Sequence, residues 1–515
     1  MTTMSTDVVI SGAGPNGLML ARELALAGVR PVVLDLLGEP SPEPKANGLV
    51  GQVIRTLDMR GLYHRFGGAP GAPTESPAWT FSGIPVSFTE LADNPMYALL
   101  ISQPQLVAAL HDSVRELGVD VRWGHELTGL CQRDGAVTVA VTAPGGDYEL
   151  DTRYLVGADG GRSVVRKRAG IGFPGHTMDM VARLAHVRLP DHLRVADGYE
   201  VPGYGRLPFG HSRLGGGGLV FASFEPSRSM IGTLEYGVGP VREDEPMTLG
   251  ELKESLYRVV GVDIPIETPP GPGPHALRRI NGQNTRQADR YREGDIFLVG
   301  DAAHVQSAMG GPGLNLGLQD AVNLGWKLAA DVNGWAPAGL LDTYQQERYP
   351  VGERVMMQSM SQTALMAPGP EVTALRGLFG ELVRDRDTAG RIAGLLAGSD
   401  VRYELGDDHP LSGLLFPDLE LPGGGRVAKL LHDGRARLVD FGIAGDGGYR
   451  SVVDPWRDRV TVTTVAAECA PAALLIRPDG YVAWAADAVS PVDAQRLRAA
   501  LRRWFGAPAD FVTPG

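Results

Sequence analysis

The chain has 515 residues, 43% hydrophobic and 21% charged, and its 48 basic and 60 acidic side chains give a net charge of −12. At ~100–200 residues per domain this length predicts about two to four domains. The acidic balance argues against a nucleic-acid partner, which usually needs a basic face. There is no signal-peptide pattern at the N-terminus and no run of about 18 apolar residues, so we expect no secretion and no membrane span.

The first elements in chain order form a strand, a tight turn, a helix and a second strand over residues 7–37. VRPVVLDLL predicts a second buried strand, of the apolar type found in parallel sheets covered on both faces. The following Pro- and Gly-rich loop contains Lys45. A helix is predicted over Gln103–Leu117, strands follow at 119–124 and 135–143, and RYLVGADGGRSVVRKRAG predicts strand, turn and helix.

A different pattern occupies about Phe173 to Asn284, where VARLAHVRL, GGLVFASF and MIGTLEYGV predict an antiparallel sheet, with GGGG at 215–218 as a loop. DIFLVGDAAH returns to the buried-strand type, and long helices follow. The tail predicts strands and a terminal helix. We therefore expect an α/β nucleotide-binding domain made of residues 1–174 and 285–398, an inserted β-sheet domain at 175–284 and a small α/β domain at 399–515.

Gly12, Gly14 and Gly17 form a GxGxxG motif between a predicted strand and a predicted helix. In that context glycines permit a tight turn and let backbone N–H groups approach a pyrophosphate at the helix N-terminus. Asp35 closes the second strand, where an acidic side chain accepts hydrogen bonds from ribose hydroxyls. The motif predicts a dinucleotide site.

Two further motifs lie at the ends of buried strands. Asp159 stands in LVGADGGRS, where Asp-Gly is also a common turn pair. Asp301 stands in GDAAH, and GGPGLN at 310–315 then opens a long helix whose N-terminus favours negative charge. Two anion-compatible helix starts on one sheet suit an extended ligand such as FAD.

GAGPNG, LVGADGGRS, GDAAH, GGPGLN and LQDAVNLGWKLA, in this order, resemble the signature of the group A, p-hydroxybenzoate hydroxylase-like flavoprotein monooxygenases. The resemblance covers essentially the whole chain and is nearest to the branch that hydroxylates polycyclic aromatic polyketides in antibiotic pathways. It implies a Rossmann-like (glutathione reductase-type) FAD domain, an inserted antiparallel substrate sheet and a thioredoxin-like C-terminal domain. The tail lacks CxxC, so we expect it to pack or dimerise rather than carry thiol chemistry.

The resemblance also implies roles for matching positions. It places the pyrophosphate at the glycine turn, the adenosine ribose at Asp35, the ribityl chain at Gln103 and Asp301, and the flavin O2 edge at backbone amides of the third motif. FAD would be held noncovalently by Gly12, Gly14, Pro15, Asn16, Gly17, Asp35, Leu36, Lys45, Gln103, Asp159, Asp301, Gly311, Gly313, Leu314 and Asn315. The candidate substrate pocket comprises Ala308, Met309, Gly310 and Phe221.

Three positions depart from the family pattern. Leu36 replaces the Arg that usually follows the acidic residue, Ala308 replaces a Pro, and Pro312 replaces a Gln. The last two stand beside the expected reaction centre, so the oxygenated flavin could also carry out a reaction other than simple hydroxylation. His304 follows Asp301 closely, but its place in the family is structural or near FAD rather than acid–base.

We therefore expect a cytoplasmic, metal-free monooxygenase in which NADPH or NADH reduces FAD and a flavin C4a-hydroperoxide, formed with O2, hydroxylates an aromatic small molecule. The protein would position the substrate and exclude water. Homodimer formation stays open. Two alternatives also stay open: Baeyer–Villiger-type insertion or another oxidative rearrangement of a polyketide quinone, and a non-catalytic FAD-binding partner protein.

Overall fold

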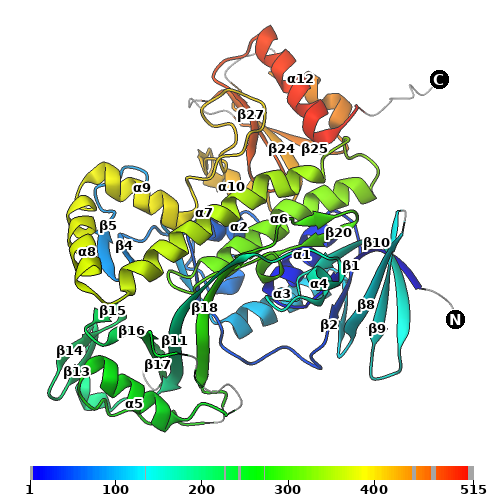
Figure 1. Cartoon of the computed structure of the whole chain (residues 1–515). Coiled ribbons are helices and arrows are strands. Elements are labelled where there is room, and N and C mark those ends of the chain that lie inside the picture. The colour runs from blue at the N-terminus through cyan, green and yellow to red at the C-terminus, as the bar shows by residue number, and fades with distance from the viewer. Residues whose placement is uncertain are drawn as a thin grey trace, which may run out of the picture.

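The structure is a computed structural model that describes residues 4–133, 135–225, 228–239, 241, 245–271, 273–442, 448–465 and 471–508. Figure 1 shows a large α/β body, a β-sheet lobe carried on the long strands β11 and β18, and a second α/β lobe that ends in helix α12. Cys131 is exposed and free. Cys469 lies outside the described residues.

The body is built on an eight-stranded sheet in the order β19-β20-β10-β1-β2-β7, with the β8–β9 hairpin joined to β10. Strands β20, β10, β1, β2 and β7 run parallel, so their carboxyl ends meet at one edge. The strands are β1 (Met4–Ser11), β2 (Val32–Asp35), β7 (Asp120–Trp123), β8 (Glu126–Arg133), β9 (Ala136–Thr142), β10 (Tyr148–Gly157), β19 (Arg292–Glu293) and β20 (Ile296–Leu298).

Local sequence explains how this sheet is covered. Val8, Val9 and Ile10 of β1 are all fully buried, as a strand covered on both faces requires. The predicted first helix is α1 (Pro15–Leu26), and the helix predicted at Gln103–Leu117 is α3 (Gln103–Glu116), started by a Ser102–Gln105 capping box. Short helices α2 (Val53–Asp58) and α4 (Val164–Arg168) follow β3 and β10.

The β-sheet lobe is a six-stranded sheet in the order β15-β16-β17-β11-β18-β21, antiparallel throughout. The amphipathic helix α5 (Leu249–Val260) packs against β17 and β11. The GGGG loop prediction was wrong in part, since Gly217 and Gly218 begin β16. The strands are β11 (Gly175–Val187), β15 (Gly210–Leu214), β16 (Gly217–Glu225), β17 (Arg228–Tyr236), β18 (Arg278–Gln287) and β21 (His304–Val305).

Smaller strands and further helices complete the β-sheet lobe and the body. A three-stranded sheet in the lobe consists of β12 (Arg194–Val195), β13 (Gly198–Val201) and β14 (Gly205–Pro208). In the body, β3 (Gly48–Val50) pairs with β6 (Ala98–Leu100), and β4 (Ala78–Phe81) pairs with β5 (Ile84–Ser87). The body continues as helices α6 (Pro312–Val332), α7 (Asp342–Met366), α8 (Pro370–Leu382) and α9 (Arg386–Ala397).

The C-terminal lobe is a four-stranded sheet in the order β25-β24-β26-β27, in which only β24 and β25 are parallel. Its hydrophobic core includes Trp326 and Leu340 from the α6–α7 region, so the lobe and the body share one core. The lobe contains β22 (Glu420–Leu421), β23 (Gly425–Arg426), α10 (Val427–Leu430), β24 (Ala436–Asp440), α11 (Arg450–Val453), β25 (Val460–Thr464), β26 (Ala473–Ile476), β27 (Val482–Ala486) and α12 (Pro491–Phe505).

Candidate functional site

The three sequence motifs lie together at the carboxyl edge of the parallel sheet. GAGPNG follows β1, LVGADGG closes β10, and GDAAH follows β20, and these three strands are adjacent. Ligands of open α/β sheets bind at this edge, outside the carboxyl ends of the strands. The topology therefore gathers residues separated by almost 300 positions in the sequence into one site.

The glycines of the first motif differ in their surroundings. A side chain at Gly12, whose φ is +110°, would stand 2.4 Å from the Ala158 carbonyl oxygen. One at Gly17 would stand 1.9 Å from the Gly12 carbonyl oxygen, so both positions are glycine because backbone packs there. Gly14, at the N-cap of α1, has no protein atom within 4 Å of its Cβ position. It leaves open space over a helix N-terminus, which is where a pyrophosphate binds.

Asp35 fixes the same turn. Its Oδ2 accepts a hydrogen bond from the Ala13 N–H at 2.7 Å, and its Oδ1 accepts one from the Leu37 N–H at 2.9 Å. The carboxylate retains further lone pairs, because each oxygen accepts only one of these bonds. Leu36 is 65% exposed and contributes no polar group.

Asp159 has a structural contact and an unused oxygen. Its Oδ2 accepts hydrogen bonds from the backbone N–H groups of Val164 and Val165, at 2.7 and 3.1 Å, and so supports the start of α4. Its Oδ1 is buried and has no protein partner. Burial raises the pKa of Asp159, and these hydrogen bonds oppose the rise.

The first and third motifs touch through Asn16. A side chain at Gly300, whose φ is +60°, would stand 1.9 Å from the Asn16 Nδ2, and one at Gly317 of α6 would stand 2.4 Å from it. Asn16 thus fills a gap between two glycines, while its Oδ1 has no protein partner.

Asp301, Lys45 and Gln103 come from three segments. Solvent reaches Asp301, yet burial by the surrounding protein raises its pKa, against the opposing charges of His304 and Lys45. The Gln103 N–H donates to the Ala46 carbonyl at 2.8 Å, which holds the start of α3 beside the Lys45 loop.

His304 is fully buried, and its Nε2 pairs with Asp320. Its Nε2 lies 2.6 Å from Oδ2 of Asp320, whose Oδ1 accepts from the Arg348 Nε at 2.7 Å. Burial opposes ionisation of Asp320, but Arg348 and His304 hold its pKa below the ordinary value. This geometry gives His304 a structural role.

The GGPGLN segment turns sharply into α6. Gly310 and Gly311 have φ of +80° and +71°, which favours glycine, and Pro312 occupies the first helical turn. The Asn315 side chain ties the turn together, because its Nδ2 donates to the Gly311 carbonyl at 2.8 Å and its Oδ1 accepts from the Val50 N–H at 3.2 Å. Leu314 is partly buried against the core.

The four predicted pocket residues do not lie together. Ala308 is exposed, Met309 is buried and Gly310 is half-buried, all on the loop before α6. Phe221, in contrast, is fully buried in the core between the inserted sheet and α5, with its ring centroid 5.4 Å from that of Tyr199 and 5.2 Å from that of Phe209. Placing Phe221 in a pocket was therefore a misassignment: the strand alternates faces, and Phe221 points to the α5 side.

Two polar side chains that the sequence analysis did not single out, His211 and Gln362, also bear on the site. His211 pairs with Val220, the neighbour of Phe221, and therefore lies on the face away from α5. Burial alone lowers the pKa of His211. Gln362 of α7 accepts a hydrogen bond from the Ser82 N–H at 3.1 Å, and its buried Nε2 has no protein partner and lies beside Gly310. Strand alternation could have indicated His211 once the α5 face was known, whereas no local signal marks Gln362.

The residues present fit FAD. Gly14 and Gly311 leave open space at two helix N-termini. Buried polar atoms without a protein partner border the three motifs, namely Asn16 Oδ1, Asp159 Oδ1, His304 Nδ1 and both amide atoms of Gln306. A buried polar group left unpaired costs about 1–3 kcal/mol, so these atoms favour a polar ligand.

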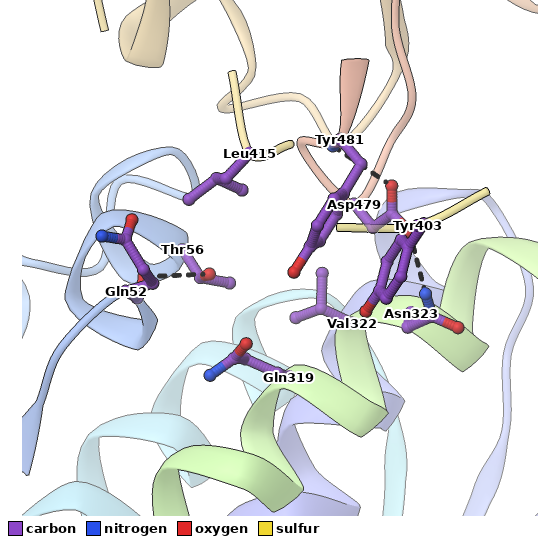
Figure 2. A pocket seen from close by; sticks show the side chains of 9 residues that line it. All are labelled: Gln52, Thr56, Gln319, Val322, Asn323, Tyr403, Leu415, Asp479 and Tyr481. Carbon is purple, nitrogen blue, oxygen red and sulfur yellow. Dashed lines mark hydrogen bonds between the residues drawn. The ribbon is translucent and has the colours of Figure 1, made fainter. Parts of the chain in front are cut away.

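A separate crevice lies between the body and the C-terminal lobe. Figure 2 shows it with Tyr403 and Tyr481 side by side on one wall and Gln52, Thr56 and Gln319 on the other. None of the three motifs lines it. The described residues contain no cluster of His, Cys, Asp or Glu that could hold a metal ion. Among them, no helix combines the length and apolar content that crossing a membrane requires.

Comparison with known proteins decides the family. Residues 5–359 match the FAD binding domain family, and residues 409–508 match the family described as aromatic-ring hydroxylase, C-terminal. The chain belongs to the FAD binding domain family. It is an FAD-dependent monooxygenase, with O2 as co-substrate and NAD(P)H as reductant. Its overall α/β fold is that of the p-hydroxybenzoate hydroxylase-like monooxygenases.

The similar proteins match along their whole length. A 12-dehydrotetracycline 5-monooxygenase/anhydrotetracycline 6-monooxygenase from Streptomyces rimosus is 39% identical, over 98% of this chain and 100% of the relative. A rifampicin monooxygenase from Streptomyces venezuelae is 38% identical, over 97% and 99%. The solved structure of OxyS anhydrotetracycline hydroxylase from Streptomyces rimosus superposes with a TM-score of 0.85 at 38% identity, over 98% of this chain and 100% of that one.

Proposed function

We propose that this enzyme hydroxylates a polycyclic aromatic polyketide on an antibiotic pathway. The observation that carries the proposal is full-length similarity to a relative named for tetracycline-type substrates, at 39% identity. The open glycine positions at two helix starts and the apolar side of the inserted sheet are compatible with it.

The FAD-holding residues follow from the motif geometry. We assign the pyrophosphate to the space at Gly14 and the adenosine ribose to the free lone pairs of Asp35. Asp301 and Gln103 would bind the ribityl chain, with Lys45 nearby. The backbone N–H groups of Leu314 and Asn315 would face the flavin, because they belong to the first turn of α6.

Bound FAD supplies hydride acceptance and dioxygen activation. The chain contributes binding, orientation and exclusion of water. With the flavin bound beside it, the N-terminus of α6 would stabilise negative charge, because the N–H groups of a first helical turn and the helix dipole favour an anion. Asn315 holds that turn in shape through its two side-chain hydrogen bonds.

The substrate would lie between the GGPGLN loop and the face of the inserted sheet that is turned away from α5. Half-buried residues of that face are Leu184, Val220, Ala222, Met230 and Leu234, with His211 as a polar exception. This apolar surface suits a large flat ligand.

The finer architecture belongs to the same proposal. We assign residues 1–174 and 285–398 to the FAD domain, 175–284 to the substrate domain and 399–515 to a thioredoxin-like domain. The order β25-β24-β26-β27, with one parallel and two antiparallel pairings, supports the last assignment. We also propose a cytoplasmic protein.

The test is turnover with a panel of polycyclic aromatic polyketides. We expect substrate-dependent NAD(P)H consumption coupled to oxygen uptake, and NMR should place one new hydroxyl on a ring carbon. An oxygen inserted beside a ketone would instead support the Baeyer–Villiger alternative. No substrate-stimulated oxygen uptake with any member would overturn the proposed substrate class.

A further inference from the structure

One face of α6 carries a buried polar stripe that the reaction described above does not use. Asp320, Asn323 and Lys327 stand at positions i, i+3 and i+7, which places them on the same side of the helix. Each is 0% or 1% exposed. The same helix begins at the GGPGLN turn, so whatever holds the stripe also holds that turn.

The N-terminal end of the stripe is tied to the GDAAH motif. Asp320 accepts hydrogen bonds from His304 Nε2 at 2.6 Å and from the Gly300 N–H at 3.3 Å. It also accepts from Arg348 of α7, whose NH2 donates to the Leu316 carbonyl at 3.1 Å. One carboxylate thus joins α6, α7 and the turn that contains Asp301.

The C-terminal end of the stripe is tied to the β26–β27 turn of the C-terminal lobe. Lys327 Nζ donates to Glu347 and to Asn323, at 2.8 Å each. Glu347 also accepts two hydrogen bonds from Arg477, at 2.7 and 2.8 Å. Asn323 Nδ2 donates to Asp479 at 3.1 Å, so Asp479 reaches α6 directly and Arg477 reaches it through Glu347 of α7.

Tyr403 joins the two halves of the network. Its hydroxyl accepts from Arg348 NH1 at 2.9 Å, and the Arg477 guanidinium lies over its ring, 5.7 Å from the centroid. The ring also stacks on Tyr481 with centroids 4.1 Å apart. Figure 2 shows both rings beside Asp479 and Asn323, facing the helix. The contacts therefore form one buried system from the lobe to the flavin motifs.

Burying so many charged groups carries a large desolvation cost. Removing several charges from water costs several kcal/mol per ion before pairing offsets it. What the network does specify is position, because a shift of α6 by one residue, about 1.5 Å along its axis, would displace Asp320, Asn323 and Lys327 together from their partners outside the helix.

We propose that Arg477, Asp479 and Tyr403 of the C-terminal lobe are positioning residues for the flavin: through the α6 stripe they fix the axial place of the GGPGLN turn. The inference rests on the proposed role of the α6 N-terminus. Loosening the stripe would move the turn from the flavin and weaken its hold on the reduced, negatively charged form more than on the neutral oxidised form. The flavin midpoint potential would then become more negative.

The test uses the holoenzyme and two variants that avoid an unpaired buried charge. Tyr403→Phe removes one acceptor of Arg348. The double variant Lys327→Met/Glu347→Gln removes one cation and one anion while the Arg477–Asp479 pair remains. The control is Tyr449→Phe, a buried tyrosine of the same lobe whose hydroxyl donates to the Ala488 carbonyl at 2.8 Å and accepts from the Ser490 N–H at 3.4 Å, both outside α6.

Midpoint potential, FAD dissociation constant and melting temperature are measured for each. We expect both stripe variants to weaken the binding of reduced FAD about tenfold more than the binding of oxidised FAD. For a two-electron couple this makes the midpoint potential about 30 mV more negative. Tyr449→Phe should leave the potential unchanged even where it lowers the melting temperature. A potential unchanged in both stripe variants overturns the positioning role, whatever happens to stability. A wild-type chain that binds no FAD would instead overturn the assigned function.

Discussion

At the residue scale, Gly14 is set apart from its two neighbouring motif glycines by the space around it. Gly12 and Gly17 pack against backbone, and a side chain at either would disrupt the turn itself. Gly14 has extended backbone angles and no protein atom near its Cβ position. A substitution there therefore tests the ligand rather than the fold.

We expect Gly14→Val to abolish FAD binding while the chain folds with little change, because the new side chain would occupy the space assigned to the pyrophosphate. Flavin content after purification and circular dichroism give the two readouts. Gly377→Val is the matched control, since this glycine of α8 also has open space around it and lies far from the motifs in sequence. Full flavin content in Gly14→Val would remove the dinucleotide assignment.

Ala308 is the second residue whose substitution is informative. Its carbonyl accepts from the Gly311 N–H at 2.9 Å, while its own N–H donates to no backbone acceptor among the described residues. Proline, the commoner family residue, would therefore stiffen the loop at no cost in backbone hydrogen bonds. We expect Ala308→Pro to change the rate modestly and to keep the product.

Product analysis and hydrogen peroxide release during turnover check this expectation. A tenfold rate change needs only about 1.4 kcal/mol, so a rate effect alone is no sign of altered chemistry. A new product or a marked rise in hydrogen peroxide would show that Ala308 tunes the outcome, against a merely supporting loop.

At the element scale, β1, α1, β2, α3 and α6 could be predicted because their signals are local. Periodicity, glycine turns and a capping box all lie within one short window of sequence. The face of a strand is not local information. Alternation along β16 predicts that Phe221 and Val220 point oppositely, but only the docking of α5 decides which side is core.

The polar network of α6 was also invisible in the sequence. Asn323 and Asp479 are 156 residues apart, and nothing near either residue indicates the other. Chemistry-bearing motifs are readable because glycines and acids must stand at fixed spacing around a ligand. Pairings that set the position of an element depend on the whole fold.

The packing of α5 on the inserted sheet carries a pH prediction. A hydrogen bond from Arg279, helped by Arg183, lowers the pKa of Glu251 to about 2 from an ordinary 4.5. The carboxylate therefore contributes stability above its ordinary pKa, and this contribution is lost as pH falls from about 4.5 toward 2. We expect stability to fall over that window.

Glu251→Gln should flatten this part of the stability profile, measured by urea unfolding of the apoprotein at stepped pH. Glu254→Gln, an exposed position on the same helix, is the control and should leave the profile as in the wild type. An equal slope in wild type and Glu251→Gln would contradict a stabilising role for the Arg279–Glu251 contact.

At the scale of the whole molecule, the C-terminal lobe shares a hydrophobic core and a buried polar network with the body. Trp326 and Leu340 from the α6–α7 region lie in the same core as Trp484 and Trp504 of the lobe. Glu347 of α7 pairs with Arg477 of the lobe, and Asn323 of α6 donates to Asp479. The lobe thus contributes both to the hydrophobic core of the body and to its buried ion pairs.

A chain that ends at residue 398 should therefore not accumulate as a soluble flavoprotein. Truncation would expose Trp326 and Leu340 to water and leave Glu347 and Arg348 without Arg477 and Tyr403, and breaking a buried charge pair alone costs about 3–5 kcal/mol. That loss is a large part of the total stability of many domains, about 5–15 kcal/mol. The measurement is the yield, flavin content and melting temperature of residues 1–398, compared with the full chain and with a full chain carrying Tyr449→Phe. A soluble, yellow fragment that melts as cooperatively as the full chain would show that the lobe is an independent module, and the shared core would then contribute little to the stability of the body.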